Sequence, residues 1–269
     1  MPYHRNRPFH PNRLFSPISS LISLIILLVG LFPAAGWAKT PVDAVELMRL
    51  VDEMWRGKTS RAKMTMTVKT RRYERSMTLE AWSEGSEKSL IRILSPKKDR
   101  GIATLKVEKN IWNYLPKVNR VTKVPASMMM GSWMGSHFTN DDLVKESSFE
   151  KDYASEITFT GKRDGMDVYE VTSTPRLDAA VVWGKVVTIV SQTGLLPVKA
   201  LYFDEEGKLT REMAFQEPTR FGQRTVPAVL LLTTLEKPEE FTAIRYETLE
   251  YDIALPDRLF SLSRLRSSR

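Results

Sequence analysis

From residue 61 onward the sequence alternates apolar and polar residues with a period of two, and this pattern constrains the fold more than any other feature. Residues 61–69 place Ala62, Met64, Met66 and Val68 on one face and polar residues on the other, which is typical of a strand with one wet face. Alternation or short apolar runs predict further strands at 73–82, 89–94, 102–107, 111–115, 157–161, 168–172, 198–203 and 209–215. Turn residues at 163–165 and 204–207 indicate hairpins. Because no helix is predicted between these strands, we expect a mainly β (α+β) fold with one strongly curved antiparallel sheet.

A single helix is predicted ahead of the strands. Thr40 is a suitable N-cap, Pro41 suits the first helical position, and Asp43 is an acid in the first turn. Apolar residues follow at helical spacing, and Gly57 can adopt the positive φ that often ends a helix. We therefore expect a helix over 41–56, and its wide apolar face requires a large surface such as the curved sheet to cover it.

The first 38 residues have the pattern of a secretory signal peptide. Arg5, Arg7 and Arg13 form a basic start without any acid, an apolar run covers 18–32, and Gly36 and Ala38 are the small residues of a cleavage site before Lys39. The alternative is an uncleaved anchor, which the short apolar run disfavours because a spanning helix needs about 20 residues. We expect cleavage after Ala38, a periplasmic protein, and one domain over 39–269, since no repeat or linker divides it.

The residue inventory argues against several kinds of chemistry. The chain has 40 Lys and Arg, 32 Asp and Glu, and no Cys, so disulfides, thiol nucleophiles and cysteine metal sites are excluded. Beyond the leader only His137 remains as a histidine, and neither a nucleophile elbow nor a glycine-rich phosphate loop is present. We expect no enzyme, no nucleic-acid partner and no metal, although His137 with Asp141 and Asp142 is a formal set of ligand types. The basic residues near the early strands either face solvent or meet anionic head groups or an acidic partner: Arg61, Lys63, Arg71, Arg72 and Arg75.

Residues 128–138 fit neither a helix nor a strand. This segment holds three consecutive methionines and two aromatic residues, with Gly131 and Gly135 between them. Methionine is flexible and polarizable, which suits a surface that accepts irregular apolar ligands. The segment is therefore either a loop folded permanently into the core or a lid over a lipid-sized cavity.

Several methionine and aromatic side chains are candidates for binding an acyl chain. Trp112 and Tyr114 share one face of a predicted strand, and we expect that face to look inward, with Ile111, Asn113 and Leu115 on the opposite face. The full candidate set is Met64, Met66, Trp82, Trp112, Tyr114, Met128, Met129, Met130, Trp133, Met134 and Phe138.

Six short motifs in order give the chain a family resemblance. They are SPKKDRGIA at 95–103, WNYLPKVNRV at 112–121, MGSHFTNDDL at 134–143, YEV at 169–171, KVV at 185–187 and GLLP at 194–197. With them the chain resembles the outer-membrane lipoprotein-sorting family of LolA-like periplasmic carriers over nearly all of residues 40–262. His137 and Asn140 stand where the family's M-G-S-x-F-x-x-x-D-L run has an acid and an aromatic residue.

The resemblance implies an incomplete antiparallel β-barrel closed over helices, with an apolar interior that holds acyl chains. It implies no catalysis and no cofactor. A carrier of this kind works as a monomer between an inner-membrane transporter and an outer-membrane acceptor, with a lipoprotein or lipid as cargo. The second hypothesis is a ligand-sensing or transporter-accessory module on the same fold, because one fold serves several functions.

Overall fold

The computed structural model describes residues 42–145, 149–177, 179 and 181–266. The predicted leader, its cleavage site and the first helical residues expected, Thr40 and Pro41, lie outside this part. None of the helices in these residues is long and apolar enough to span a membrane.

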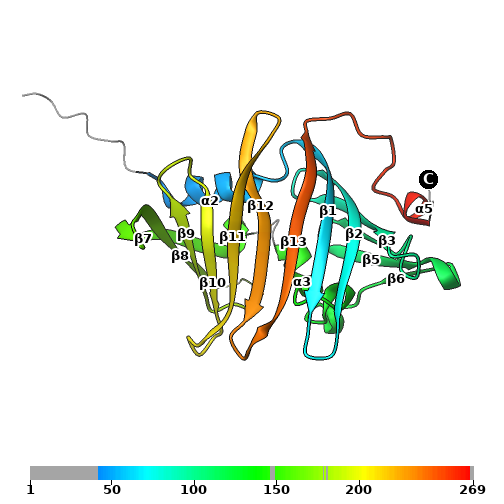
Figure 1. Cartoon of the computed structure of the whole chain (residues 1–269), viewed down its shortest axis with the longest axis horizontal. Helices are drawn as coiled ribbons and strands as arrows, with labels where there is room; N and C mark the ends of the chain where they lie inside the picture. Colours follow the sequence, from blue (N-terminus) through cyan, green and yellow to red (C-terminus); the bar gives the residue numbers. More distant parts are fainter. Residues whose placement is uncertain (1–41, 146–148, 178, 180, 267–269) are drawn as a thin grey trace, which may run out of the picture. The chain divides into compact units, whose positions relative to one another are not determined.

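Strands make up most of the described chain, and Figure 1 shows them as one curved sheet with the helices beside it. The strands are β1 (Thr59–Lys69), β2 (Glu74–Glu84), β3 (Lys88–Ser95), β4 (Ala103–Val107), β5 (Asn110–Leu115), β6 (Arg120–Lys123), β7 (Tyr153–Arg163), β8 (Met166–Pro175), β9 (Lys185–Ser191), β10 (Pro197–Phe203), β11 (Leu209–Phe221), β12 (Arg224–Thr234) and β13 (Lys237–Tyr251). The helices are α2 (Ala44–Glu53), α3 (Asn140–Lys145), α4 (Phe149–Asp152) and α5 (Leu262–Arg266). Three single 3₁₀ turns are η1 (Pro116–Val118), η2 (Ala126–Met128) and η3 (Trp133–Gly135).

The described strands form one 13-stranded antiparallel sheet in the order β6-β5-β4-β3-β2-β1-β13-β12-β11-β10-β9-β8-β7. Every neighbour in the sheet is a neighbour in sequence except β1 and β13, which pair in its middle. The edges are therefore β6 and β7, and the segment between them carries η2, η3, α3 and α4. This confirms the prediction of a curved antiparallel meander.

We call the face of the sheet that carries Ala62, Met64, Met66 and Val68 the inner face. These side chains cluster with buried residues of β2, β11 and β12 and with Trp133 and Phe138 of the connecting segment. Helix α2 lies on this face as well, where Leu47 and Val51 pack against Val171 and Val190. The inner face is thus the main core, and α2 is held within the curve of the sheet.

The outer face has a smaller core of its own beneath the end of the chain. Leu259 and Leu265 pack against Leu90, Leu105 and Tyr114, and α5 lies beside β3 to β6 (Figure 1). The Arg92 guanidinium donates to the carbonyl oxygens of Arg264 and Leu265. Both faces of β3, β4 and β5 are therefore covered.

Helix α2 is shorter than predicted, because its cap is Asp43 and not Thr40. The Asp43 carboxylate accepts the Glu46 backbone N–H at 2.8 Å, and an aspartate cap supplies the acceptor that a helix start needs. The helix ends at Glu53, three residues before the predicted end. Gly57 has the expected positive φ, 59°.

Candidate functional site

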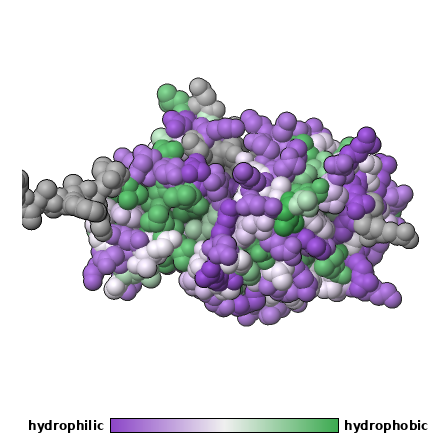
Figure 2. Space-filling model, turned by 90° about the horizontal axis from the view of Figure 1, so that it is seen from above, coloured by the Kyte–Doolittle hydropathy of each residue, from purple (hydrophilic) through white to green (hydrophobic). Residues whose placement is uncertain are grey.

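A cavity of about 290 Å³, partly open to solvent, lies on the inner face of the sheet, close to the lower end of the usual range for small-ligand sites. Its wall combines α2, strands from both halves of the sheet, and the segment after η2. Most of the lining is apolar: Met48, Val51, Trp55, Ala62, Met64, Ala81, Trp82, Ile91, Trp133, Phe138, Leu143, Val186, Ala200, Tyr202, Met213, Phe215, Leu230, Ile244 and Tyr246. Seen from above, the molecule also shows apolar residues gathered between hydrophilic surfaces (Figure 2).

The segment around η3 closes part of this cavity and is tied to the half of the sheet that contains β1 to β6. Trp133 is 3% exposed, and its indole N–H donates to the Thr104 hydroxyl of β4 at 3.1 Å. Just before β2, the Tyr73 hydroxyl donates to the Gly135 carbonyl at 3.2 Å. The Arg75 guanidinium donates to the Met134 carbonyl. These bonds place Trp133 and Phe138 in the core and hold the polar backbone between them.

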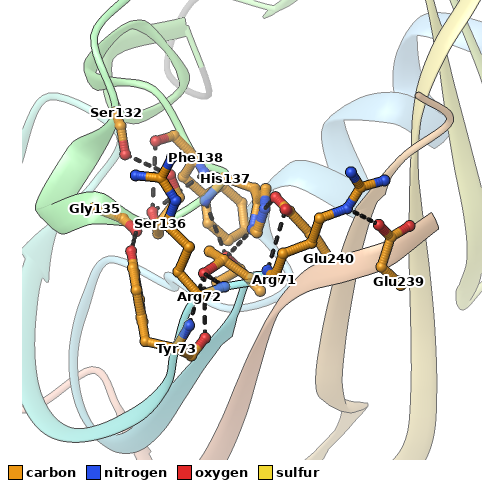
Figure 3. A network of polar contacts seen from close by, with 12 residues as sticks. Arg71, Arg72, Tyr73, Ser132, Gly135, Ser136, His137, Phe138, Glu239 and Glu240 are labelled. Atoms are coloured by element: carbon orange, nitrogen blue, oxygen red, sulfur yellow. Dashed lines mark hydrogen bonds and ion pairs between the residues drawn. The ribbon is translucent and has the colours of Figure 1, made fainter. Parts of the chain in front are cut away.

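His137 belongs to this attachment (Figure 3). Its backbone N–H donates to the Thr242 hydroxyl at 2.9 Å, and ring Nδ1 is 2.8 Å from the same oxygen. Ring Nε2 lies 3.6 Å from Glu240, which also accepts the Arg71 backbone N–H. His137 is therefore a link between the η3 segment and β13, and within the described residues no three His, Asp or Glu side chains are grouped to hold a metal.

A buried ion pair fixes α3 at the cavity wall. Asp142 accepts two hydrogen bonds from Arg211 of β11, at 2.6 and 2.9 Å, and the Arg211 side chain is 7% exposed. The guanidinium also lies 4.3 Å from the ring centres of both Trp183 and Tyr202. Burial opposes the charge, but hydrogen bonding and attraction to Asp142 outweigh it and raise the pKa of Arg211. Asp142 therefore has a structural partner and is not part of a cluster with His137.

One end of the cavity is polar. Asp52 lies in the last turn of α2 and Arg56 follows just after it. The two side chains form an ion pair at this end of the cavity. Lys106 of β4 is 4% exposed, and its ammonium donates to the Ser86 carbonyl at 2.7 Å. Burial raises the pKa of Asp52 from its ordinary value, against the attraction of Arg56 and Lys106. A second cavity of about 320 Å³ shares Asp52, Arg56 and Ser86 with the first and continues outward beside β7.

The structure brings only some of the predicted acyl-binding residues to the cavity. Met64, Trp133 and Phe138 line it, and Trp82 borders it while packing into the outer cluster. Met66 is fully buried in the core beside them. Met134 packs at the edge of this core.

The three consecutive methionines are not among the residues that line the cavity. Met128 is 61% exposed and Met130 is 52% exposed, while Met129 is half-buried. The Asn140 amide holds this turn by donating to the carbonyls of Met128 and Gly131. The predicted segment thus divides into a buried part around Trp133 and an exposed part around the methionines.

The predicted orientation of Trp112 and Tyr114 is wrong. Trp112 pairs with Leu105 and Tyr114 with Ala103, and directly opposed residues share a face of the sheet. All four belong to the outer cluster under the end of the chain. Asn113 instead shares a face with Thr104, whose hydroxyl donates to it at 2.7 Å and also accepts the Trp133 indole N–H. Ile111 and Asn113 therefore lie on the inner face.

Most of the basic residues of the early strands have partners outside the cavity. Arg61 pairs with Glu80 at 2.6 Å, Lys63 with Glu247 at 2.8 Å, and Arg71 with Glu239 at 2.5 Å.

Sequence reasoning missed the polar end of the cavity and several aromatic lining residues: Asp52, Arg56, Lys106, Trp55, Tyr202, Phe215 and Tyr246. The apolar face predicted for the first helix was the one signal that included Trp55.

Comparison with solved structures identifies the class of fold. A DUF1329 family protein from Desulfovibrio piger matches with a TM-score of 0.74 and 21% identity over 82% of this chain and 97% of that chain. A putative outer membrane lipoprotein-sorting protein domain from Vibrio parahaemolyticus matches with a TM-score of 0.72 and 22% identity over 83% and 98%. A LolA superfamily protein from Nitrosomonas europaea gives 0.70 and 20% over 83% and 99%. The chain has the LolA-like fold.

A family model matches residues 85–267, and its description is that of an uncharacterized protein. The match covers more than half of the chain, and the chain belongs to this family. The comparison with curated proteins gives no match.

Proposed function

We propose that the protein is a periplasmic carrier that binds the acyl chains of a lipoprotein or lipid in the inner-face cavity and moves them towards the outer membrane. The observation that carries the proposal is the cavity itself, which is lined mainly by apolar side chains and lies in a fold shared with a lipoprotein-sorting domain. The leader predicted from the sequence supports export. In this proposal the chain acts without catalysis, with an inner-membrane transporter as donor and an outer-membrane acceptor.

The energetics suit a carrier. Each CH₂ group removed from water contributes roughly 0.8 kcal/mol, so even a partly enclosed chain binds well and release is the harder step. Methionines at 64 and 213 and the aromatic residues of the wall can adapt to chains of different shape. The exposed Met128 and Met130 lie in the segment that leads to Trp133, and we include them in the proposed binding surface.

The alternative is a sensor or transporter-accessory module on the same fold. A carrier should retain lipid when it is purified from the periplasm, and mass spectrometry of an organic extract detects it. A sensor should instead copurify with a protein partner and give an empty extract.

A cavity-filling variant tests where the chain binds. Ala81 lines the cavity and is half-buried, so Ala81→Leu should reduce binding of a neutral fluorescent acyl probe several-fold by occupying its space. Ala154 is exposed on β7, and Ala154→Leu is the matched control that should bind normally. Equal binding by both variants, with the fold intact, would contradict the assignment of this cavity.

A further inference from the structure

Two turns lie together at the edge of the sheet opposite β7 (Figure 1). The first turn, residues 96–102, joins β3 to β4, and the second, residues 116–119, joins β5 to β6. A Cβ atom added to Gly101 would lie 3.5 Å from Cγ of Pro116, so the two turns are in contact. Exposed cationic and apolar side chains of these turns and of the strand ends beside them form what we call the turn surface: Lys97, Lys98, Leu115, Lys117, Val118 and Arg120.

The local structure of the second turn holds an apolar side chain out in water. Val118 is 66% exposed, and Leu115 beside it is 43% exposed. Asn119 adopts the left-handed conformation, with φ 47°, and its backbone N–H donates to the Pro116 carbonyl at 3.1 Å. The Tyr114 hydroxyl donates to the side-chain oxygen of Asn119 at 3.3 Å. The turn is thus fixed at both its backbone and its side chains, and Val118 stays exposed at its tip.

The charges around these apolar residues are almost all positive. The sequence has no Asp or Glu between 109 and 140. The one acid within the two turns is Asp99, and its Oδ2 atom is buried. Among the residues that the structure describes, the four cations of the turn surface take part in no ion pair. The exposed Arg61 and Lys63 of β1, by contrast, each have a carboxylate partner.

This combination fits an anionic lipid surface better than a folded protein partner. Neither of the two cavities described above is lined by the turn surface, whereas specific protein interfaces seat their anchoring side chains in pockets. Anionic head groups attract clustered Lys and Arg. Apolar side chains between such cations can enter the boundary between head groups and acyl chains, and the long stems of Lys and Arg let their charges stay among the head groups.

We propose that the turn surface docks the protein on an anionic membrane, with Val118 and Leu115 among the head groups and the four cations against lipid phosphates. This inference rests on the proposed function and adds to it the surface from which cargo is collected or on which it is released. Docking keeps the carrier beside the bilayer while an acyl chain is transferred.

Binding to lipid vesicles tests the proposal. Protein purified from the periplasm is sedimented with vesicles of phosphatidylcholine alone or with vesicles that also contain phosphatidylglycerol. We expect binding to the anionic vesicles to be about ten-fold tighter or more at low salt. The difference should shrink at high salt, because dissolved ions screen exposed charges. Equal binding to both kinds of vesicle, or binding to neither, would overturn the proposal.

A substitution at the tip of the turn assigns the binding to this surface. Val118→Asp removes the apolar side chain and adds a negative charge, so it should weaken binding to the anionic vesicles several-fold. Met166 is the matched control, because it is 42% exposed and begins β8 beside the opposite edge of the sheet. Met166→Asp makes the same change in charge and should bind nearly as the wild type does. An equal loss in both variants would contradict the assignment.

A second pair of variants tests the cations. Lys117→Gln with Arg120→Gln should weaken binding to the anionic vesicles roughly thirty-fold, since each Lys or Arg near such a surface contributes about five-fold. Lys162→Gln with Arg220→Gln removes the same charge from exposed positions near the ends of β7 and β11 and should have a much smaller effect. If the two double variants weaken binding equally, net charge and not this surface attracts the protein, and the proposal fails.

The neutral fluorescent acyl probe separates this inference from the function on which it rests. Variants of the turn surface should bind the probe as the wild type does, which also shows that they are folded. Ala81→Leu should show the reverse behaviour, with weakened probe binding and normal binding to anionic vesicles. A wild type that binds the probe without preferring anionic vesicles overturns the docking surface and leaves the carrier in place. Failure to bind the probe refutes the carrier, whatever the vesicles show.

Discussion

The buried pair of Asp142 and Arg211 makes a quantitative prediction about stability. Asp142→Asn preserves the shape of the side chain and an oxygen that can accept the Thr139 backbone N–H, but it removes the charge. Arg211 then stays buried between Trp183 and Tyr202 without a carboxylate. Removing one partner of a buried pair costs about 3–5 kcal/mol. With a urea m-value of about 3 kcal/mol/M, the unfolding midpoint should fall by about 1–1.7 M.

The chain contains a matched control for this experiment. Arg245 and Glu217 have the same two-bond geometry, at 2.6 and 2.7 Å, but both side chains are more than half exposed. Glu217→Gln should leave the midpoint unchanged within error, because solvent screens exposed pairs. Adding Arg211→Met to Asp142→Asn should recover part of the loss, since no buried charge remains unpaired. If Asp142→Asn and Glu217→Gln shift the midpoint equally, burial does not set the strength of this pair.

Two further predictions concern the methionine segment and Asp52. Replacing Met128, Met129 and Met130 together by Ser should leave the melting temperature nearly unchanged, because two of the three are exposed; a large fall would mean that they belong to the core. Burial raises the pKa of Asp52, so the folded protein binds this proton more tightly than the unfolded chain, and stability falls as pH rises through that interval. Urea unfolding between about pH 4 and 7 should therefore show a steeper decline in wild type than in Asp52→Asn, and parallel curves would contradict this assignment.

The sequence predicted best those strands whose two faces differ. β1 and β2 begin and end within two residues of the predicted bounds, because one face meets the core and the other meets water. The sequence pattern does not predict β12, since five consecutive residues from Val226 to Leu230 are buried and no alternation remains. β13 begins with three exposed residues, which obscure its pattern.

The site was less predictable, because the nature of each face depends on distant parts of the chain. Tyr114 illustrates this, because local reasoning places it on the inward face. The tail that packs Leu259 and Leu265 over the outer face reverses this assignment. The Lys106 ammonium reaches the Ser86 carbonyl and acts on Asp52 of α2, and neither contact leaves a local pattern in the sequence.

The pairing of β1 with β13 has a consequence for how the chain reaches its native state. Thr65 and Glu247 are hydrogen-bonded although they stand 182 positions apart, so the centre of the sheet closes only after almost the whole chain has emerged. Contacts of such long sequence separation form slowly. Until then each half of the sheet has an open strand edge, which favours association with other chains. A product truncated before β13 would lose the middle of its sheet and not an end, and two incomplete sheets with exposed edges would remain.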